Sequence, residues 1–182
     1  MKPQEFNSKY PIRNESWTAR QLGLKLNTSP GPDAIGNNVI VEVKFTKKPN
    51  QKRYYKWHIQ EHQVLYPKAH NMEAVLALGF YTFDNDISEI QNIDEIDETR
   101  VDRTLYLVNW DWINQFQANR KSVGKTKTSQ WDNRFRYLLA NKLPEMIAKF
   151  EVEGGEIFAG PDVDIKLFPN LYRPIYSCNV PF

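Results

Sequence analysis

Cysteine is almost missing from this chain of 182 residues, with Cys178 as the single example. One thiol excludes an intramolecular disulfide and a zinc site built from cysteines, and it fits a reducing compartment. No stretch approaches the roughly 20 consecutive apolar residues that a membrane-spanning helix needs. The segment from Met1 to Phe6 has no apolar core of the kind found in secretory signals. We therefore expect a cytoplasmic protein without a membrane partner.

Internal repeats and low-complexity segments are also missing, and an aromatic fraction of 13% argues against a disordered chain. The length favours a single domain with a core large enough to fold alone. Within it we expect a core of about residues 10–83, an acidic insertion of about 84–102 that faces solvent, and a C-terminal extension of about 103–182.

The chain has no large excess of charge, because its formal net charge is only +2, yet its charges are segregated. Residues 84–102 carry a net charge of −7, and basic residues concentrate in 44–56 and 119–142. Clustered cations are what a nucleic-acid partner requires, although the second basic stretch is equally typical of a solvated surface loop. The residues that we expect to contact double-stranded DNA are Lys47, Lys48, Lys52, Arg53, Arg120, Lys121, Lys125, Lys127 and Arg134.

Residues 32–44 predict a tight β-hairpin. The turn is indicated by Gly36-Asn37-Asn38, because Gly and Asn tolerate positive φ. The segment from Val39 to Phe45 is apolar apart from Glu42 and Lys44, which is typical of a strand covered on both faces. Charged residues are rarely placed in such a strand without a task.

The hairpin brings two carboxylates and an amine together. Side chains alternate along a strand, so Glu42 and Lys44 share one face. Folding back at the turn places Asp33 opposite about residue 41, with its Cβ roughly 5–8 Å from that of Glu42. Two carboxylates this close repel each other unless a cation lies between them. Oxygen ligands favour Mg²⁺, and we expect Mn²⁺ to substitute for it.

Pro32-Asp33, a short gap and Glu42-Val43-Lys44 on an apolar strand resemble the PD-(D/E)XK nuclease superfamily. The resemblance implies a restriction-endonuclease-like α/β core, in which helices flank a central mixed sheet, here with a C-terminal α+β extension. It also implies Mg²⁺-dependent hydrolysis of phosphodiester bonds in DNA. Asp33, Glu42 and the Val43 carbonyl would hold the metal, and Lys44 would orient or help deprotonate the attacking water. The alternative is a surface strand with an ordinary Glu-x-Lys pair.

The flanking elements match the order that the resemblance implies. Asn14 is a suitable N-cap for a helix through Leu22 that stops at Gly23. Glu15 would lie in its first turn, either as a further metal ligand or as a partner of the helix dipole. After the hairpin we expect a helix from Trp57 to Tyr66 that ends at Pro67, and then a strand over 74–81. Some superfamily members carry a glutamine on such a helix, and either Gln60 or Gln63 fits.

The C-terminal half predicts further elements. A strand is expected over 104–108, an amphipathic helix over 131–139 and a short helix from Pro144 to Phe150. The segment 161–166, Pro-Asp-Val-Asp-Ile-Lys, echoes the nuclease motif. Its two acids lie too close in sequence for a two-strand site, so we expect a terminal strand with ordinary charges.

Two rival motifs point to other chemistry. His58-Ile59-Gln60-Glu61-His62 fits the H-x-x-E-H pattern of a zinc protease, provided that both histidines lie on one helix. The basic stretch just before it suits phosphate better than peptide. Gly124-Lys125-Thr126 lacks the glycine that a phosphate-binding P-loop needs five residues earlier, because Asn119 stands there.

The functional expectation is a metal-dependent DNA endonuclease, most consistent with a type II restriction-like enzyme. Cutting both strands with one active site per chain implies a homodimer or sequential nicking. A Holliday-junction resolvase or a mobile-element endonuclease of the same superfamily is the first alternative. A non-catalytic DNA-binding module and the zinc protease are the others.

Overall fold

The computed structural model describes residues 10–48, 56–83, 92–120 and 134–171. Its α-helices are α2 (Pro11–Leu22) and α3 (Tyr66–His70). Its strands are β1 (Lys25–Leu26), β2 (Ala34–Ile35), β3 (Val39–Lys47), β4 (Lys56–Gln60), β5 (Glu73–Thr82), β6 (Asp102–Asn109), β7 (Ala118–Arg120), β8 (Arg134–Leu139), β9 (Ala148–Val152) and β10 (Gly155–Ala159). In this part of the chain, no helix is long and apolar enough to cross a membrane.

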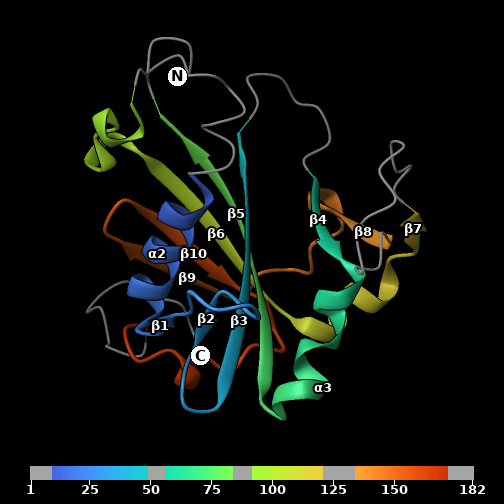
Figure 1. Ribbon diagram of the computed structural model, residues 1–182. Coiled ribbons are helices and arrows are strands. Elements are labelled where there is room, and N and C mark those ends of the chain that lie inside the picture. The colour runs from blue at the N-terminus through green and yellow to red at the C-terminus, as the bar shows by residue number, and fades with distance from the viewer. Residues whose placement is uncertain (1–9, 49–55, 84–91, 121–133, 172–182) are drawn as a thin grey trace.

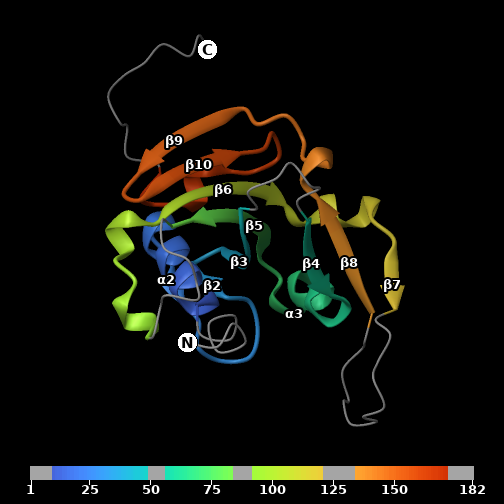
Figure 2. The ribbon, with the colours of Figure 1, turned by 90° about the horizontal axis from the view of Figure 1, so that it is seen from above.

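The strands form a large mixed sheet and a small one. The large sheet has seven strands in the order β1-β2-β3-β5-β6-β10-β9, which Figure 2 shows from β3 to β9. Within it β3 is parallel to β5 and β6 is parallel to β10, and the remaining neighbours are antiparallel. The small sheet has the order β4-β8-β7. The expected α/β fold with a central mixed sheet and flanking helices is therefore confirmed.

The central strands are apolar on both faces because both faces are covered. Helix α2 packs Trp17 and Leu22 on one face of the large sheet, and the small sheet packs Trp57 and Leu138 on the other (Figure 1). The indole Nε1 of Trp57 also donates a hydrogen bond of 2.9 Å to the carbonyl of Gly79 in β5. The small sheet is thus fixed to the centre of the large one.

Helix α2 begins at Pro11, so the prediction of Asn14 as its N-cap is wrong. Pro11 stands in the first turn, where a missing N–H is tolerated, and Gly23 ends the helix at φ 72° as expected. Asn14 lies inside the helix, where its side chain accepts a hydrogen bond from Arg103 of β6. Glu15 is likewise past the first turn, so it is not a first-turn partner of the helix dipole.

The described part of the acidic segment, residues 92–102, does not simply face solvent. Ile96 and Val101 are buried in a cluster with Tyr10. Glu98 accepts hydrogen bonds from Arg13 of α2 at 3.0 Å and from the buried Arg103 at 2.5 Å. The segment therefore ties the start of α2 to β6, and its charges are partly neutralised within the fold.

The helix predicted from Trp57 to Tyr66 is wrong over most of its length. Residues 56–60 form β4, in which Trp57 and Ile59 are buried and the alternate side chains are exposed. A 3₁₀ helix follows over Glu61–Leu65, and Pro67 lies in the first turn of α3 rather than ending a helix. Pairing with β8 and packing on the large sheet decide the outcome, because in a strand Trp57 and Ile59 both face the apolar side chains of the large sheet.

The helices predicted in the C-terminal half are also wrong. The described part of 131–139 is β8, and the end of 144–150 belongs to β9, which pairs with β10. The strand expected over 161–166 is a turn that leads into a 3₁₀ helix over Ile165–Leu167. The strands expected over 74–81 and 104–108 are confirmed as β5 and β6. Among the described residues after 102, strands and 3₁₀ helices occur and no α-helix does.

Replacing Gly79 with alanine should destabilise the protein. A Cβ there would lie 2.3 Å from the ring of Phe45, which packs edge-on against Trp17. We expect the Gly79→Ala change to lower the free energy of unfolding by about 1–3 kcal/mol in urea denaturation. Gly160→Ala is the control, because its Cβ would meet no atom closer than 3.4 Å. Equal stability of the two variants would contradict this packing.

Candidate active site

The β2–β3 hairpin has the turn that the sequence predicted. Ala34 pairs with Val41, and a backbone hydrogen bond closes the turn over residues 36–39. Asp33 precedes Ala34, so it lies across from Glu42. Local turn chemistry and strand alternation are enough to bring these two carboxylates together.

Pro32 and Asp33 end the β2–β3 ladder in a specific way. In this register the next partner of Val43 would be Pro32, which has no N–H to donate. The Pro32 carbonyl instead accepts a hydrogen bond of 2.8 Å from the Asn27 side chain. The N–H of Val43 therefore donates to the Asp33 carboxylate, at 2.7 Å to Oδ2. The dipeptide thus holds one carboxylate against the backbone between Glu42 and Lys44.

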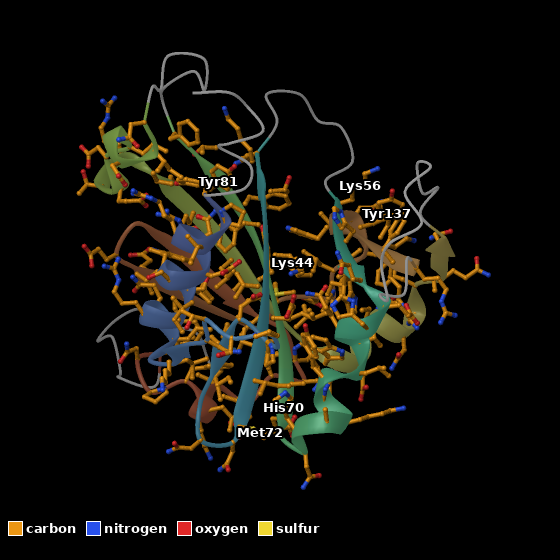
Figure 3. All side chains as sticks on the ribbon, viewed as in Figure 1. Lys44, Lys56, His70, Met72, Tyr81 and Tyr137 are labelled. Carbon is orange, nitrogen blue, oxygen red and sulfur yellow. The ribbon has the colours of Figure 1, made fainter. Side chains whose placement is uncertain are left out.

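Glu42 is fully buried, and its polar partners reach it from two directions. The Lys44 ammonium lies 2.5 Å from Glu42 Oε1 and 4.0 Å from Asp33 Oδ2. Gln63 Nε2 also donates to Glu42 Oε1. The second carboxylate oxygen, Oε2, has no hydrogen-bond partner. Figure 3 shows Lys44 near the centre of the large sheet, on the side of the small sheet.

Burial dominates the electrostatics of the carboxylates. Desolvation raises the pKa of Glu42 to about 7, with Lys44 opposing the shift and Asp33 adding to it. Burial also raises the pKa of Asp33, against the Lys44 charge and the Val43 N–H. Burial alone would lower the pKa of Lys44, but the charges of Glu42 and Asp33 outweigh it and raise this pKa. Lys44 is therefore a cation whose charge balances two acids in a site that disfavours anions.

Glu15 and Gln63 approach the site from outside the hairpin, but among the described residues Glu15 does not form, with Asp33 and Glu42, a group that could share a metal ion. Burial, followed by the Asp33 charge, raises the pKa of Glu15 to about 7, so this helix residue lies within electrostatic reach of the hairpin acids. Of the two candidate glutamines, Gln63 contacts Glu42. Its Oε1 accepts from the backbone N–H of Gln60 at 3.0 Å, which leaves Nε2 free to donate to the carboxylate.

Tyr66 is a neighbour that the sequence reasoning missed. Burial, and then the Glu42 charge, raises the pKa of its hydroxyl, and Lys44 and Asp33 also act on it. The missed signal is the spacing Gln63-x-x-Tyr66, which places both side chains on one short turn that follows β4.

The residues of the hairpin fit a hard divalent ion held in part by substrate and water. Asp33 and Glu42 would supply oxygen ligands, and Oε2 of Glu42 is a buried acceptor without a donor. Among the described residues, no group of three or more His, Cys, Asp and Glu side chains could share a metal ion. Mg²⁺ is often bound by one or two carboxylates together with waters and a phosphate of the substrate, whereas catalytic zinc usually has three protein ligands.

The zinc-protease motif is not assembled in the way that its chemistry requires. His58 lies in β4, whereas His62 lies in the following 3₁₀ helix, so the two histidines do not face one another across a helical turn. The ring of His58 contacts those of Phe135 and Tyr137 on β8. The condition that both histidines share one helix is therefore not met.

The predicted DNA-contacting residues are only partly placed. Lys47 ends β3 with its Nζ 4.6 Å from the centroid of the Phe83 ring, and Lys48 is exposed beside it. Arg134 is exposed at the start of β8, where it pairs with Arg120 at the end of β7. The others lie outside the described residues: Lys52, Arg53, Lys121, Lys125 and Lys127.

Comparison of the chain with protein-family models, with curated proteins and with solved structures found no match.

The buried Glu42 should make stability depend on pH. Its pKa is 4.5 in an unfolded chain and about 7 in the folded protein, so the folded state binds more protons between these values. In EDTA the free energy of unfolding should therefore fall as the pH rises from 4.5 to 7, and level off above that. Glu42→Gln should remove this component, which we expect to be roughly 1–3 kcal/mol.

Urea denaturation at pH 5, 6, 7 and 8 measures this component as the difference between the wild type and Glu42→Gln. The matched control is Glu151→Gln, which changes an exposed carboxylate in β9. A wild-type curve parallel to that of Glu42→Gln would show that Glu42 keeps an ordinary pKa.

Proposed function

We propose that this protein is a Mg²⁺-dependent nuclease that hydrolyses phosphodiester bonds in double-stranded DNA. The observation that carries the proposal is the meeting of Asp33, Glu42 and Lys44 at one hairpin, with a carboxylate oxygen of Glu42 buried and unpartnered. An unsatisfied buried polar atom costs roughly 1–3 kcal/mol, so a purely structural ion pair gains nothing from it. A divalent cation satisfies both carboxylates.

The hairpin residues have distinct tasks in this chemistry. A bound Mg²⁺ would supply an activated water and would neutralise charge on the phosphate. Asp33 is held in place by the Val43 N–H, and Glu42 is oriented by Gln63. Lys44, which lies 2.5 Å from Glu42 and 4.0 Å from Asp33, would orient the attacking water and stabilise the negative charge that develops on the phosphate oxygens.

The proposed biological role is that of a type II restriction-like endonuclease acting as a homodimer. Junction cleavage is the second candidate, and one observation favours keeping it. Part of the supposed extension, β6, β10 and β9, belongs to the large sheet itself. Fewer residues therefore lie outside the core than the sequence suggested. A compact junction resolvase needs few residues beyond its core.

Purified protein should cut DNA in Mg²⁺ and should not cut it in EDTA. The substrates are a plasmid and a synthetic four-way junction in one reaction, resolved on gels. Glu42→Gln and Asp33→Asn should each slow cleavage at least about a hundredfold, because each removes an anionic ligand of the metal that would activate the water and neutralise the phosphate. Discrete plasmid fragments indicate a sequence-specific enzyme, and cleavage of the junction alone indicates a resolvase.

The same Glu151→Gln protein controls for loss of an unrelated carboxylate, and circular dichroism controls for folding. Full activity of well-folded Glu42→Gln would refute the assignment of the site. Binding of both substrates without cleavage by the wild type would instead indicate a DNA-binding module.

A further inference from the structure

A cavity of about 260 Å³ lies at the N-terminal end of α2, beside the candidate active site. Tyr10, Asn14 and Glu15 line it from the helix, and Val43 and Lys47 line it from β3. Tyr81 of β5 closes it, and Figure 3 shows this residue at the end of the large sheet where α2 begins. We call this space the α2 cavity. It shares Glu15 and Val43 with the candidate active site but not Lys44 or Glu42.

Asn14 lines the α2 cavity and has an amide N–H donor without a partner. Asn14 is 1% exposed, and its Oδ1 accepts a hydrogen bond of 2.9 Å from Nε of Arg103. Arginine carries donors only, so the amide oxygen must be the atom that faces it. Nδ2 then faces away from Arg103, which is not among the described residues that line the cavity. This nitrogen is buried and has no hydrogen-bond partner.

The other polar groups around the α2 cavity also suit an anion. Lys47 is a cation on the wall that β3 forms, with its ammonium group 4.6 Å from the centroid of the Phe83 ring, and the N-terminal end of α2 contributes the positive end of the helix dipole. Burial raises the pKa of Tyr81 to about 12, so its hydroxyl remains a neutral donor. Glu15 is the single acid among the described lining residues, and it lies on the side shared with the candidate active site.

The shape of the cavity favours a phosphate over a base. A base would be held by stacking, but the rings of Tyr10 and Tyr81 pack against each other, with centroids 5.0 Å apart. No slot is therefore left between them. A tetrahedral oxyanion is best held by several donors from different sides, and the residues that carry the amide, the ammonium and the hydroxyl line the cavity from α2, β3 and β5.

We propose that the α2 cavity binds a phosphate of the DNA backbone next to the phosphate that is cleaved. This inference rests on the proposed nuclease function, because the cavity adjoins the site that would hold the reacting phosphate. Asn14 and Lys47 would then set the position of the strand rather than take part in the reaction. A buried water is the alternative partner of Asn14 Nδ2.

The first test uses inorganic phosphate and needs no DNA. Thermal unfolding is followed in EDTA with phosphate or chloride at equal ionic strength. Phosphate should raise the Tm of the wild type and of Lys25→Gln, which changes an exposed lysine of β1. It should raise the Tm of Asn14→Asp and Lys47→Gln much less. Asn14→Asp keeps an acceptor for Arg103, replaces the Nδ2 donor with an oxygen and adds a negative charge, and both of these changes oppose phosphate binding.

The second test locates the phosphate on DNA. A short duplex that contains a mapped cleavage site is made with one neutral methylphosphonate at a time, and its affinity is measured in a Glu42→Gln background that blocks cleavage. At one position beside the cleaved bond, the neutral linkage should weaken binding about tenfold. Adding Asn14→Asp or Lys47→Gln should cause no further loss at that position, whereas the losses should multiply elsewhere.

The outcomes separate this proposal from the nuclease assignment. Coupling at one phosphate supports the backbone subsite. A phosphate-dependent Tm without such coupling would overturn it in favour of a free-phosphate site. If neither test gives a response while cleavage is intact, the proposed phosphate site is refuted and a buried water is the partner of Asn14 Nδ2. The nuclease assignment is not affected by this outcome. If the wild type cuts no DNA but responds to phosphate through Asn14, the nuclease assignment and the backbone subsite both fail.

Discussion

The burial of one carboxylate in an apolar sheet is the constraint on which the rest of the site depends. Glu42 lies in β3 beside Leu76 of β5, just beyond the residues that pair with β2, and its hydrogen-bond donors are side chains rather than backbone groups. Donors must come from side chains that approach the face of the sheet, and Lys44 and Gln63 do so. The small sheet and its 3₁₀ turn exclude solvent there, which makes the negative charge unfavourable without a cation.

Local chemistry explains how much of this site could be foreseen from the sequence. The hairpin, its turn and the shared face of Glu42 and Lys44 follow from residues close in the chain. Gln63 could not be separated from Gln60, because the choice depends on where β4 ends and the 3₁₀ turn starts. The role of Asn14 could not be foreseen either, since its partner Arg103 lies 89 positions away.

The fold shows the same division between local and distant information. The strands β5 and β6 are recognisable because a long apolar run has few other uses. In contrast, β4 buries Trp57 and Ile59 and β8 buries Leu138 only because the small sheet packs on the large one. Either segment alone carries an apolar pattern that also suits a helix. The segment that became β9 alternates Ala148, Phe150 and Val152 with Lys149 and Glu151, which is a strand signal that the prediction of a helix from Pro144 overlooked. For β4 and β8, tertiary pairing overrode local preference.

The small sheet has a consequence for the order in which the molecule assembles. The β2–β3 hairpin closes through contacts between residues that are close in sequence. In contrast, β4 pairs with β8, and β5, β6 and β7 lie between these two strands in the sequence. Contacts between distant segments form slowly because they close large loops. We therefore expect the β2–β3 hairpin to form early, while its carboxylates are still hydrated. Gln63 should reach Glu42 only when β4 packs on the large sheet. If the elements form in this order, Glu42 loses its water in the last stage of folding, after the transition state. The free-energy cost of burying its charge should then speed unfolding more than it slows folding.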